Sequence, residues 1–569
     1  MPSVVYAVWV PVALAGACLM RDGFSEYYGD LLEGQYDCPD RIVLNAYFRM
    51  AHSPGGFRMW WRAWRGSEDD LDNTHLPRLC TRFGRRLHAF ARANGIPVVH
   101  CKHGDRQHEL AQAYRPDDPD FVGVFVVFKF RAPAPTWKVQ RSATGVIQGL
   151  EFRKPYPHVN HYAFHILDPE WGHVIIQMCA HPPWRARVIL NGHEWVARRA
   201  SRKGIPFTKE GNCFTDLPSA ADLATVAETL GSPSSTGRLV GVCERWIYSA
   251  CLVFALSTEE QKRTRFRYQY SAYQLEVCRN LLFRRADQLE EVYQGVLDRT
   301  RAQLDVRKIT TVFGRRTRPR TRTRKGKPPR EHRVLERPTY DLTVFKIHFG
   351  PLTVKCYDKG ERVLRIEAIA HNTDALNCGR ELTRFGEMVA KLRAMVVRFL
   401  DVLHCLDKSC IEAGLVDALP AGTQVGRSRV GGVDIHRPRM RAVVRAVMAL
   451  SPHPDGFRAR DVAAKVRKLA GWDEEQYGTR RASYDLKKLR GKGLVERLGA
   501  RTRYQASARA LRFMTGLLLV RDHVTKPIVA MSSSPPTQPL PDNHGHLDTH
   551  YRGIEAELRR LFEALGIAG

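Results

Sequence analysis

Six histidines fall between residues 158 and 193, in a stretch whose composition is typical of β-strands. Its apolar runs AFHIL and HVIIQMCA are separated by the turn sequence DPEWG, and this pattern predicts a hairpin. Imidazole is a common metal ligand, so these strands predict a site for a divalent cation, Mg²⁺ or Mn²⁺, that would polarise a phosphate. The candidate ligands are His161, His165, His173 and His181.

Two other interpretations of the same histidines stay open, since each imidazole could be hydrogen-bonded within a sheet or stacked on RNA bases. Nicking enzymes of the HUH class hold their metal with two histidines separated by one hydrophobic residue. The segment HYAFH has three residues between its histidines and does not meet that pattern. HGH at His544–His546 matches it in letters, but lies in a Pro/Ser-rich stretch without strand character.

The net charge of the chain is +30 over 569 residues, with a sequence pI near 9.9. Such an excess of Lys and Arg favours a polyanionic partner, and we expect nucleic acid, with DNA favoured over RNA. Ribosomal and membrane-surface proteins are also basic, so charge alone does not identify an activity. The oligomeric state cannot be deduced from these features.

The densest basic segment is GRRTRPRTRTRKGKPPR, residues 314–330, which holds nine basic residues and no acidic one. Such a composition cannot bury a core, so we expect an extended arm that neutralises phosphates. A solvated linker that binds nothing is the alternative. The arm residues expected to contact nucleic acid are Arg315, Arg316, Arg318, Arg320, Arg322, Arg324, Lys325 and Lys327.

The stretch from Phe457 to Ser507 predicts two helices followed by a two-stranded hairpin, and residues 437–450 would supply a preceding helix. The second helix of the stretch, about 474–490, starts in our prediction at a capping box formed by Asp473 and Gln476, and turns Tyr484 inward. This order resembles the winged helix-turn-helix domains of bacterial multidrug-resistance repressors. The resemblance implies a helix that reads the DNA major groove and a wing that touches phosphates. The residues implied in contact are Arg480, Arg481, Lys487, Lys488, Arg490, Arg501 and Arg503. A winged helix used only for protein contact is the alternative.

A second informative segment, residues 340–370, alternates apolar and polar residues in three runs and predicts an antiparallel meander. Its sequence YDKG…LRIE resembles a motif of phage and plasmid rolling-circle replication initiators. In that family a tyrosine attacks a DNA phosphate, a lysine assists, and carboxylate and histidines bind metal. The resemblance implies Tyr357 as nucleophile, Lys359 as its electrostatic helper, and Glu367 as a metal ligand or strand partner of Arg365. A tyrosine in a hairpin is equally natural as a structural residue.

Length and composition predict an α+β multidomain protein with a mixed α/β body, antiparallel sheets, helical segments and a C-terminal winged helix. The aromatic segment FRMWWRAWRG, residues 57–66, suits either base stacking or an amphipathic helix that buries its tryptophans. The 13 cysteines lack a metal-binding spacing and are expected to be reduced. The apolar first twenty residues carry no basic n-region, so we expect no export signal, no membrane span and a cytoplasmic protein. The expected regions are 21–120 (α/β), 121–200 (His-rich β), 201–313 (helical), 314–338 (arm), 339–420 (meander with helices), 436–510 (winged helix) and 531–550 (disordered tail).

Three functions fit this sequence. The first is a nucleic-acid-binding protein encoded by a mobile element, with DNA as the favoured partner. The second is a metal-dependent DNA nickase or strand-transfer enzyme that uses Tyr357. The third is a transcriptional regulator whose large N-terminal body senses a ligand.

Overall fold

The computed structural model describes residues 21–102, 104–304, 310–312, 342–407, 411–499 and 502–526, with residues 550, 552–554, 556–557 and 560 near the C-terminus. The chain divides into two compact units. The sheet unit consists mainly of Gly29–Leu289 and Thr310–Val396, and the helical unit of Asp22–Tyr28, Glu290–Ile309 and Val397–Gly569. The expected mixed α/β architecture is confirmed, and most of its strands belong to one large mixed sheet.

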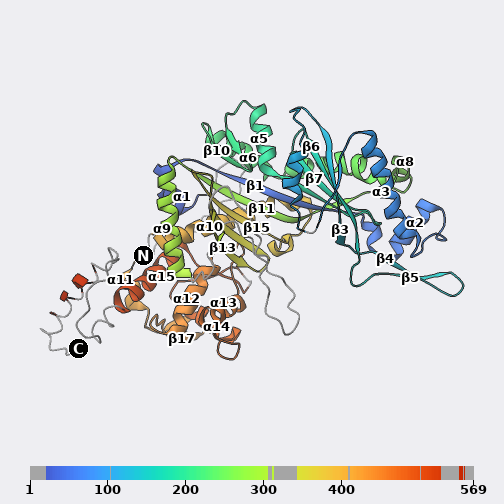
Figure 1. The fold of residues 1–569 in the computed structure, drawn as a ribbon. Coiled ribbons are helices and arrows are strands. Elements are labelled where there is room, and N and C mark those ends of the chain that lie inside the picture. Colours follow the sequence, from blue (N-terminus) through green and yellow to red (C-terminus); the bar gives the residue numbers. More distant parts are fainter. Residues whose placement is uncertain are drawn as a thin grey trace, which may run out of the picture. The chain divides into compact units, whose positions relative to one another are not determined.

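An 11-stranded mixed sheet organises the sheet unit (Figure 1). Neighbouring strands are antiparallel, except for the edge pair β2 and β3, which is parallel. In spatial order the strands are β12 (Thr310–Val312), β13 (Leu342–Phe349), β14 (Leu352–Lys359), β15 (Val363–Ala370), β11 (Gln269–Phe283), β1 (Leu32–Tyr47), β8 (Ala186–Asn191), β7 (Gly172–Cys179), β6 (His158–Asp168), β3 (Gly123–Pro133) and β2 (Val98–His100). The three runs of the predicted meander are β13, β14 and β15, so this prediction is confirmed.

The two longest strands, β1 and β11, pair in the middle of the sheet. β1 contains Pro39, which cannot donate to a ladder, and the register shifts between Pro39 and Ile42. Proline inside a sheet is tolerated at such a bulge, and a bulge also re-aims the side chains beside it. Asp40 lies at this irregularity, where its carboxylate is buried.

The expected helical character of residues 201–313 is wrong for Gln269–Phe283, which is strand β11. The C-terminal half of this strand is buried continuously, from Val277 to Phe283. A strand covered on both faces is a continuous apolar run, which periodicity cannot separate from a buried helix.

Helices and two small hairpins surround the sheet; α5, α6 and the β9–β10 hairpin lie together beside β1 (Figure 1). The helices are α2 (Pro54–Arg65), α3 (His75–Ala93), α4 (Gln107–Leu110), α5 (Gly192–Arg202), α6 (Ala220–Leu230), α7 (Ser235–Trp246) and α8 (Thr258–Arg263). Short 3-10 or π turns are η1 (Gly29–Leu31), η2 (Arg49–His52), η3 (Ala111–Tyr114), η4 (Ile247–Cys251), η5 (Leu252–Phe254), η6 (Thr373–Leu376) and η7 (Leu382–Arg384). The hairpins are β4 (Trp137–Arg141) with β5 (Ile147–Phe152), and β9 (Thr208–Glu210) with β10 (Cys213–Asp216).

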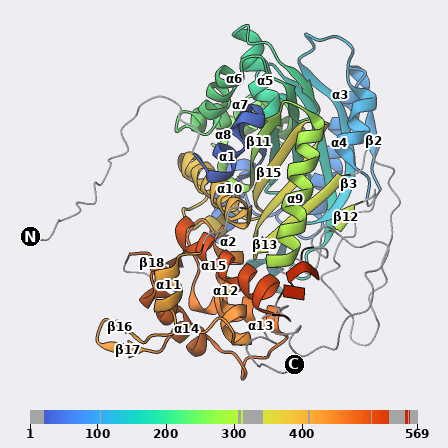
Figure 2. The same ribbon diagram turned by 90° about the vertical axis from the view of Figure 1, so that its left-hand side faces the viewer.

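In the helical unit, α12, α13 and α14 pack on one another and are followed by a short hairpin (Figure 2). An isolated bridge between Phe457 and Tyr504 adds a third segment to that hairpin. The bounds are α1 (Gly23–Tyr27), α11 (Ala413–Ala418), β16 (Thr423–Val425), β17 (Ser428–Val430), α12 (Pro438–Leu450), α13 (Ala459–Ala470), α14 (Thr479–Gly491), β18 (Glu496–Arg497), β19 (Tyr504–Gln505), α15 (Ala508–Val520) and η8 (Arg521–Thr525). Helices α9 (Ala286–Leu304) and α10 (Phe385–Asp407) belong to both units in sequence.

Candidate functional site

Tyr357 and Glu367 come together on neighbouring strands of the sheet. In the β14–β15 ladder Tyr357 is paired with Arg365 and Lys355 with Glu367, and paired residues of antiparallel strands share a face. The Tyr357 phenol donates a hydrogen bond to Oε1 of Glu367 at 2.5 Å. Lys355 Nζ donates to the other carboxylate oxygen at 3.2 Å. Glu367 is thus a strand partner of Lys355, and its carboxylate lies between a phenol and an ammonium group.

Arg365 extends this group of side chains toward β1 and α5. Its guanidinium is completely buried and donates to Asn280 Oδ1 at 2.7 Å and to the backbone oxygen of Asn212. Its Nη1 lies 3.5 Å from an oxygen of Asp40, and Asp40 also accepts a 3.1 Å hydrogen bond from His193 Nδ1. A buried arginine needs such anionic and carbonyl partners.

We call Asp40, His193, Tyr357, Lys359, Arg365 and Glu367 the polar cluster. Lys359 belongs to it because its ammonium group donates to Oδ1 of Asn212, on the turn between β9 and β10. Asn212 in turn donates to Asp40 Oδ2 at 2.7 Å. The structure therefore brings together all three residues that the initiator resemblance implied, and joins them to Asp40 and His193.

Asp40 and His193 are the two members of the cluster that the sequence interpretation missed. Asn191-Gly192 has the composition of a hairpin turn, but Asn191 instead ends β8 and caps α5. Its side chain accepts hydrogen bonds from the backbone of His193 and Glu194, which starts the helix at once. A Cβ on residue 192 would lie 1.7 Å from the Pro39 carbonyl, so only glycine permits this close approach to the bulge. An Asn followed closely by Glu, before apolar residues, was the available sign of a helix start.

The buried pair of Asp40 and His193 is arranged as carboxylate and neutral imidazole. Burial opposes ionisation of Asp40, but His193 and Arg365 together hold the pKa of that carboxyl below its usual range. Burial lowers the pKa of His193, and this outweighs the opposing effect of Asp40. The imidazole accordingly donates from Nδ1 to a carboxylate, an arrangement that fixes its orientation.

Burial, and then the charge of Glu367, raise the pKa of Tyr357 well above that of free tyrosine. The phenol is therefore protonated at neutral pH. For this oxygen to attack an electrophile, a base must accept its proton, and Glu367 is placed at hydrogen-bonding distance for that role. Nearby, burial and then Glu367 and Asp40 raise the pKa of Glu276 to about 7.

The four histidines proposed as metal ligands do not converge on Tyr357. His165 and His173 form a 2.9 Å hydrogen bond to each other and pack against Phe125. Strand β7 is five strands from β14 in the sheet order, roughly 24 Å at about 4.8 Å per strand. Within the described part of the chain, no three His, Cys, Asp or Glu side chains are grouped to hold a metal ion. The described residues do not fit the metal that the initiator resemblance implies.

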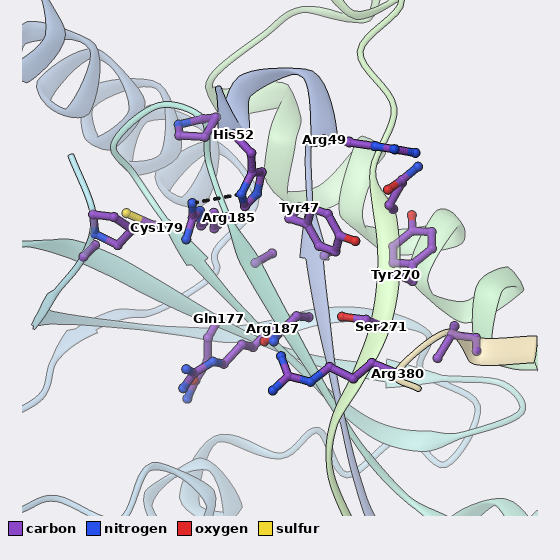
Figure 3. Close-up of a pocket in the computed structure, with 18 of the residues that line it drawn as sticks. Tyr47, Arg49, His52, Gln177, Cys179, Arg185, Arg187, Tyr270, Ser271 and Arg380 are labelled. Atoms are coloured by element: carbon purple, nitrogen blue, oxygen red, sulfur yellow. Dashed lines mark hydrogen bonds between the residues drawn. The ribbon is translucent and has the colours of Figure 1, made fainter. Parts of the chain in front are cut away.

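His161 and His181 instead line a groove of about 1380 Å³ in the sheet unit. Arginine and aromatic side chains from several strands surround it (Figure 3). The tryptophans of FRMWWRAWRG do not contribute, since Trp60, Trp61 and Trp64 are buried in α2 and its packing partners. The amphipathic-helix interpretation of that segment is thus confirmed.

Helix α14 carries most of the predicted basic contact residues of the helical unit. Arg480 and Arg481 are exposed in its first turn, whereas Lys487, Lys488 and Arg490 are half-buried. Arg503 donates to the backbone oxygens of Asp455 and Gly456 at 3.3 Å. Arg501 and the arm residues between 314 and 330 lie outside the described residues.

Two local predictions for α14 are wrong. The helix starts at Thr479 rather than near residue 474, because the reciprocal hydrogen bonds of Asp473 and Gln476 close a separate turn. Tyr484 is not turned inward, as 46% of it is exposed. The buried stripe is formed by Ala482, Asp485, Leu486 and Leu489.

Comparison of the chain with family models, curated proteins and solved structures gives no significant match. Among the described helices, none combines the length and apolar composition that crossing a bilayer requires.

Proposed function

We propose that this protein binds nucleic acid, with DNA preferred, and that α12, α13, α14 and the β18–β19 hairpin act as a winged helix. The observation that carries the proposal is the exposed pair Arg480 and Arg481 in the first turn of α14. In helix-turn-helix recognition the N-terminal residues of the second helix contact base edges in the major groove. Arginine donates bidentately to guanine and also binds phosphate.

A rigid base for α14 supports this role. Tyr477, before the helix, donates to Asp485 Oδ2 at 2.9 Å, and Arg439 of α12 lies 3.3 Å from Oδ1 of the same carboxylate. Apolar residues of α14 are buried in the same unit. Contact side chains on a fixed helix lose less conformational entropy on binding than side chains on a loop.

The C-terminal half of α14 is less open than its start. Gly491 lies against Thr423 and Val425 of the β16–β17 hairpin, and Lys488 lies near Gly431. The contact surface is consequently assigned to the first two turns, with Arg480, Arg481 and the exposed Tyr484. Lys488 stabilises this surface through a cation–π contact, 5.2 Å from the Tyr484 ring.

The test is duplex binding by the full chain with Arg480→Glu and Arg481→Glu. Each substitution replaces a phosphate-binding or base-binding cation by an anion, so we expect duplex affinity to fall at least about tenfold. The matched control is Arg78→Glu with Arg85→Glu, which makes the same charge change on exposed residues of α3, outside the proposed winged helix. Equal loss in both variants would show a diffuse charge effect and would refute the reader role of α14.

The Tyr357–Glu367 hydrogen bond favours a second candidate function, tyrosine-mediated cleavage of a DNA strand. In this reaction the phenol oxygen forms the new P–O bond, the 3′ or 5′ oxygen of the strand leaves, and Glu367 accepts the phenolic proton. Lys355 supplies positive charge beside Glu367, and Lys359 supplies positive charge within the polar cluster. A strand-cleavage assay at nucleotide resolution, with wild type and Tyr357→Phe, tests this function, and activity that survives the substitution would reject it.

A further inference from the structure

A row of paired residues forms the floor of the groove in the sheet unit. Across the strands, Ser271 pairs with Asn45, Asn45 with Arg187, and Arg187 with Gln177. Residues paired in this way share a face, so the row crosses β11, β1, β8 and β7 on one side of the sheet. Beyond it, Cys179 pairs with His161 and His161 with Phe130, which continues the floor onto β6 and β3.

Cations line this groove in excess over anions. Its lining includes Arg49, Arg185, Arg187 and Arg380, against the carboxylates of Asp374 and Glu381. Arg380 is paired with Asp374. Among the described residues, Arg49, Arg185 and Arg187 form no ion pair with a carboxylate. Three guanidinium groups are thus available to an anionic ligand.

Arg185 is incompletely satisfied within the groove. Its Nη2 contacts His52 Nδ1 at 3.4 Å, but its Nε is buried and makes no hydrogen bond with the described residues. A buried donor without an acceptor destabilises the folded state. An oxygen of a bound phosphate would supply that acceptor.

Aromatic rings stand among these arginines. Tyr47, Phe130 and Tyr270 all line the groove, and Figure 3 shows the two tyrosines beside the arginines. The Phe130 and His161 rings are stacked, with centroids 5.5 Å apart and an interplanar angle of 25°. Burial lowers the pKa of His161, so its imidazole is neutral and acts as one more flat ring. Flat rings interleaved with arginines are the combination that single-stranded nucleic acid requires, because unpaired bases stack and the backbone binds cations.

We propose that this groove binds a single-stranded nucleic acid across the face of the sheet, with Arg49, Arg185 and Arg187 on its phosphates and Tyr47 and Phe130 against its bases. The cavity volume of about 1380 Å³ exceeds the ~300–1,000 Å³ usual for a small-molecule site. A duplex keeps its bases stacked inside and offers them no access to these rings. The proposal is independent of the reader role of α14.

The first test measures binding of labelled twelve-nucleotide dT and rU strands to the full chain by fluorescence anisotropy. Arg49→Glu with Arg187→Glu changes two exposed residues. We expect affinity to fall at least about tenfold, and the slope of log K against log salt to decrease in magnitude by about 1.4, since each single-strand phosphate contact contributes about 0.7. The control, Arg78→Glu with Arg85→Glu, makes the same charge change on exposed residues of α3 outside the groove and should remain within about twofold of wild type. The dT and rU arms show which of the two strands is preferred.

A second variant separates base stacking from charge. Tyr47→Ala keeps the net charge and should weaken dT or rU binding by roughly 5- to 100-fold, whereas Tyr47→Phe should retain it. Binding of inorganic polyphosphate should not change in either variant. If Tyr47→Ala weakens the binding of polyphosphate and of oligonucleotide equally, or weakens the binding of neither, the proposal that the groove binds a single-stranded nucleic acid is refuted.

Two measurements keep the test decisive. Ultraviolet crosslinking of a bromouridine strand to the wild-type chain should label peptides that contain residues 47–52 or 177–187, and labelling confined to other peptides would overturn the proposal. The Arg480→Glu, Arg481→Glu variant should lose duplex binding and keep single-strand binding, while the groove variant should show the reverse. If the wild-type chain binds the single strand but not the duplex, the role of α14 is refuted and the groove proposal is not affected.

Discussion

The phenol of Tyr357 and the carboxylate of Glu367 are 2.5 Å apart, and Lys355 binds the other oxygen of the same carboxylate. The contact spans two neighbouring strands, so the rigid ladder of β14 and β15 positions both groups. It places a phenol and a carboxylate together without any loop.

Removing the Tyr357 hydroxyl separates its structural and chemical roles. Tyr357→Phe deletes one hydrogen bond to a charged acceptor, and we expect the free energy of unfolding to fall by about 1.5–3 kcal/mol. Urea unfolding at pH 7 measures this change, and Lys355→Met tests the other partner of Glu367. If Tyr357→Phe is as stable as wild type, the hydrogen bond from the phenol to Glu367 does not stabilise the folded protein.

A buried ion pair on β1 and β11 predicts a much larger loss of stability. Arg279 donates to both oxygens of Asp37, at 2.7 and 2.8 Å, and neither side chain is solvated. Asp37→Asn leaves the guanidinium buried without its anion and should destabilise the protein by about 3–5 kcal/mol. The exposed pair of Arg285 and Asp287 provides the control, since Asp287→Asn should leave the unfolding midpoint unchanged. Comparable losses in both variants would contradict this account.

Glu276 predicts a pH dependence of stability near neutrality. Burial, Glu367 and Asp40 raise its pKa to about 7 from 4.5, so the folded chain holds a proton that the unfolded chain has released. Its contribution is complete below pH 4.5 and is lost as the pH rises toward 7. Glu276→Gln should therefore stabilise the protein by about 3 kcal/mol at pH 8 and by nearly nothing at pH 4. Unfolding free energies at both pH values check this. An equal difference between variant and wild type at pH 4 and pH 8 would show that the raised pKa of Glu276 is not the cause.

The two hydrogen-bonded histidines predict the opposite dependence in acid. Burial lowers the pKa of His165 to about 3 and that of His173 to about 4. Below about pH 6.5 the unfolded chain gains protons that the folded chain does not, so stability falls as the pH falls toward 4. Replacing both with leucine removes both polar partners at once, which should change stability little at pH 7.5. At pH 5 the double variant should be more stable than wild type. If the double variant loses more stability than wild type between pH 7.5 and pH 5, the two histidines are not the cause of the acid dependence.

Local sequence patterns predicted those helices and strands that bury one face and expose the other. The meander of β13, β14 and β15 alternates in residue type, and α2 places its tryptophans at helical spacing. The centre of the sheet could not be predicted in this way. β11 is buried on both faces over its second half and so loses the alternation that identifies a strand.

Sequence patterns also predict only part of the candidate site, namely the contacts between residues that are close in the chain. Tyr357 and Glu367 are ten residues apart on one hairpin, a distance over which strand alternation predicts a contact. Asp40 and His193 are 153 residues apart, and they meet only because β1 and β8 pair and Asn191 starts α5 beside the Pro39 bulge. A pairing between distant strands leaves no trace in the spacing of either segment.

We expect the positive side chains of this basic chain to bind nucleic acid. The most direct measurement is a salt titration of binding by the full chain, freed of co-purified polyanion, to a labelled duplex and a labelled single strand. The account predicts binding of both at low salt, with log K falling linearly against log salt and a slope that corresponds to several phosphate contacts for each. Failure to bind either nucleic acid at low ionic strength, or an affinity that does not change with salt, would contradict it.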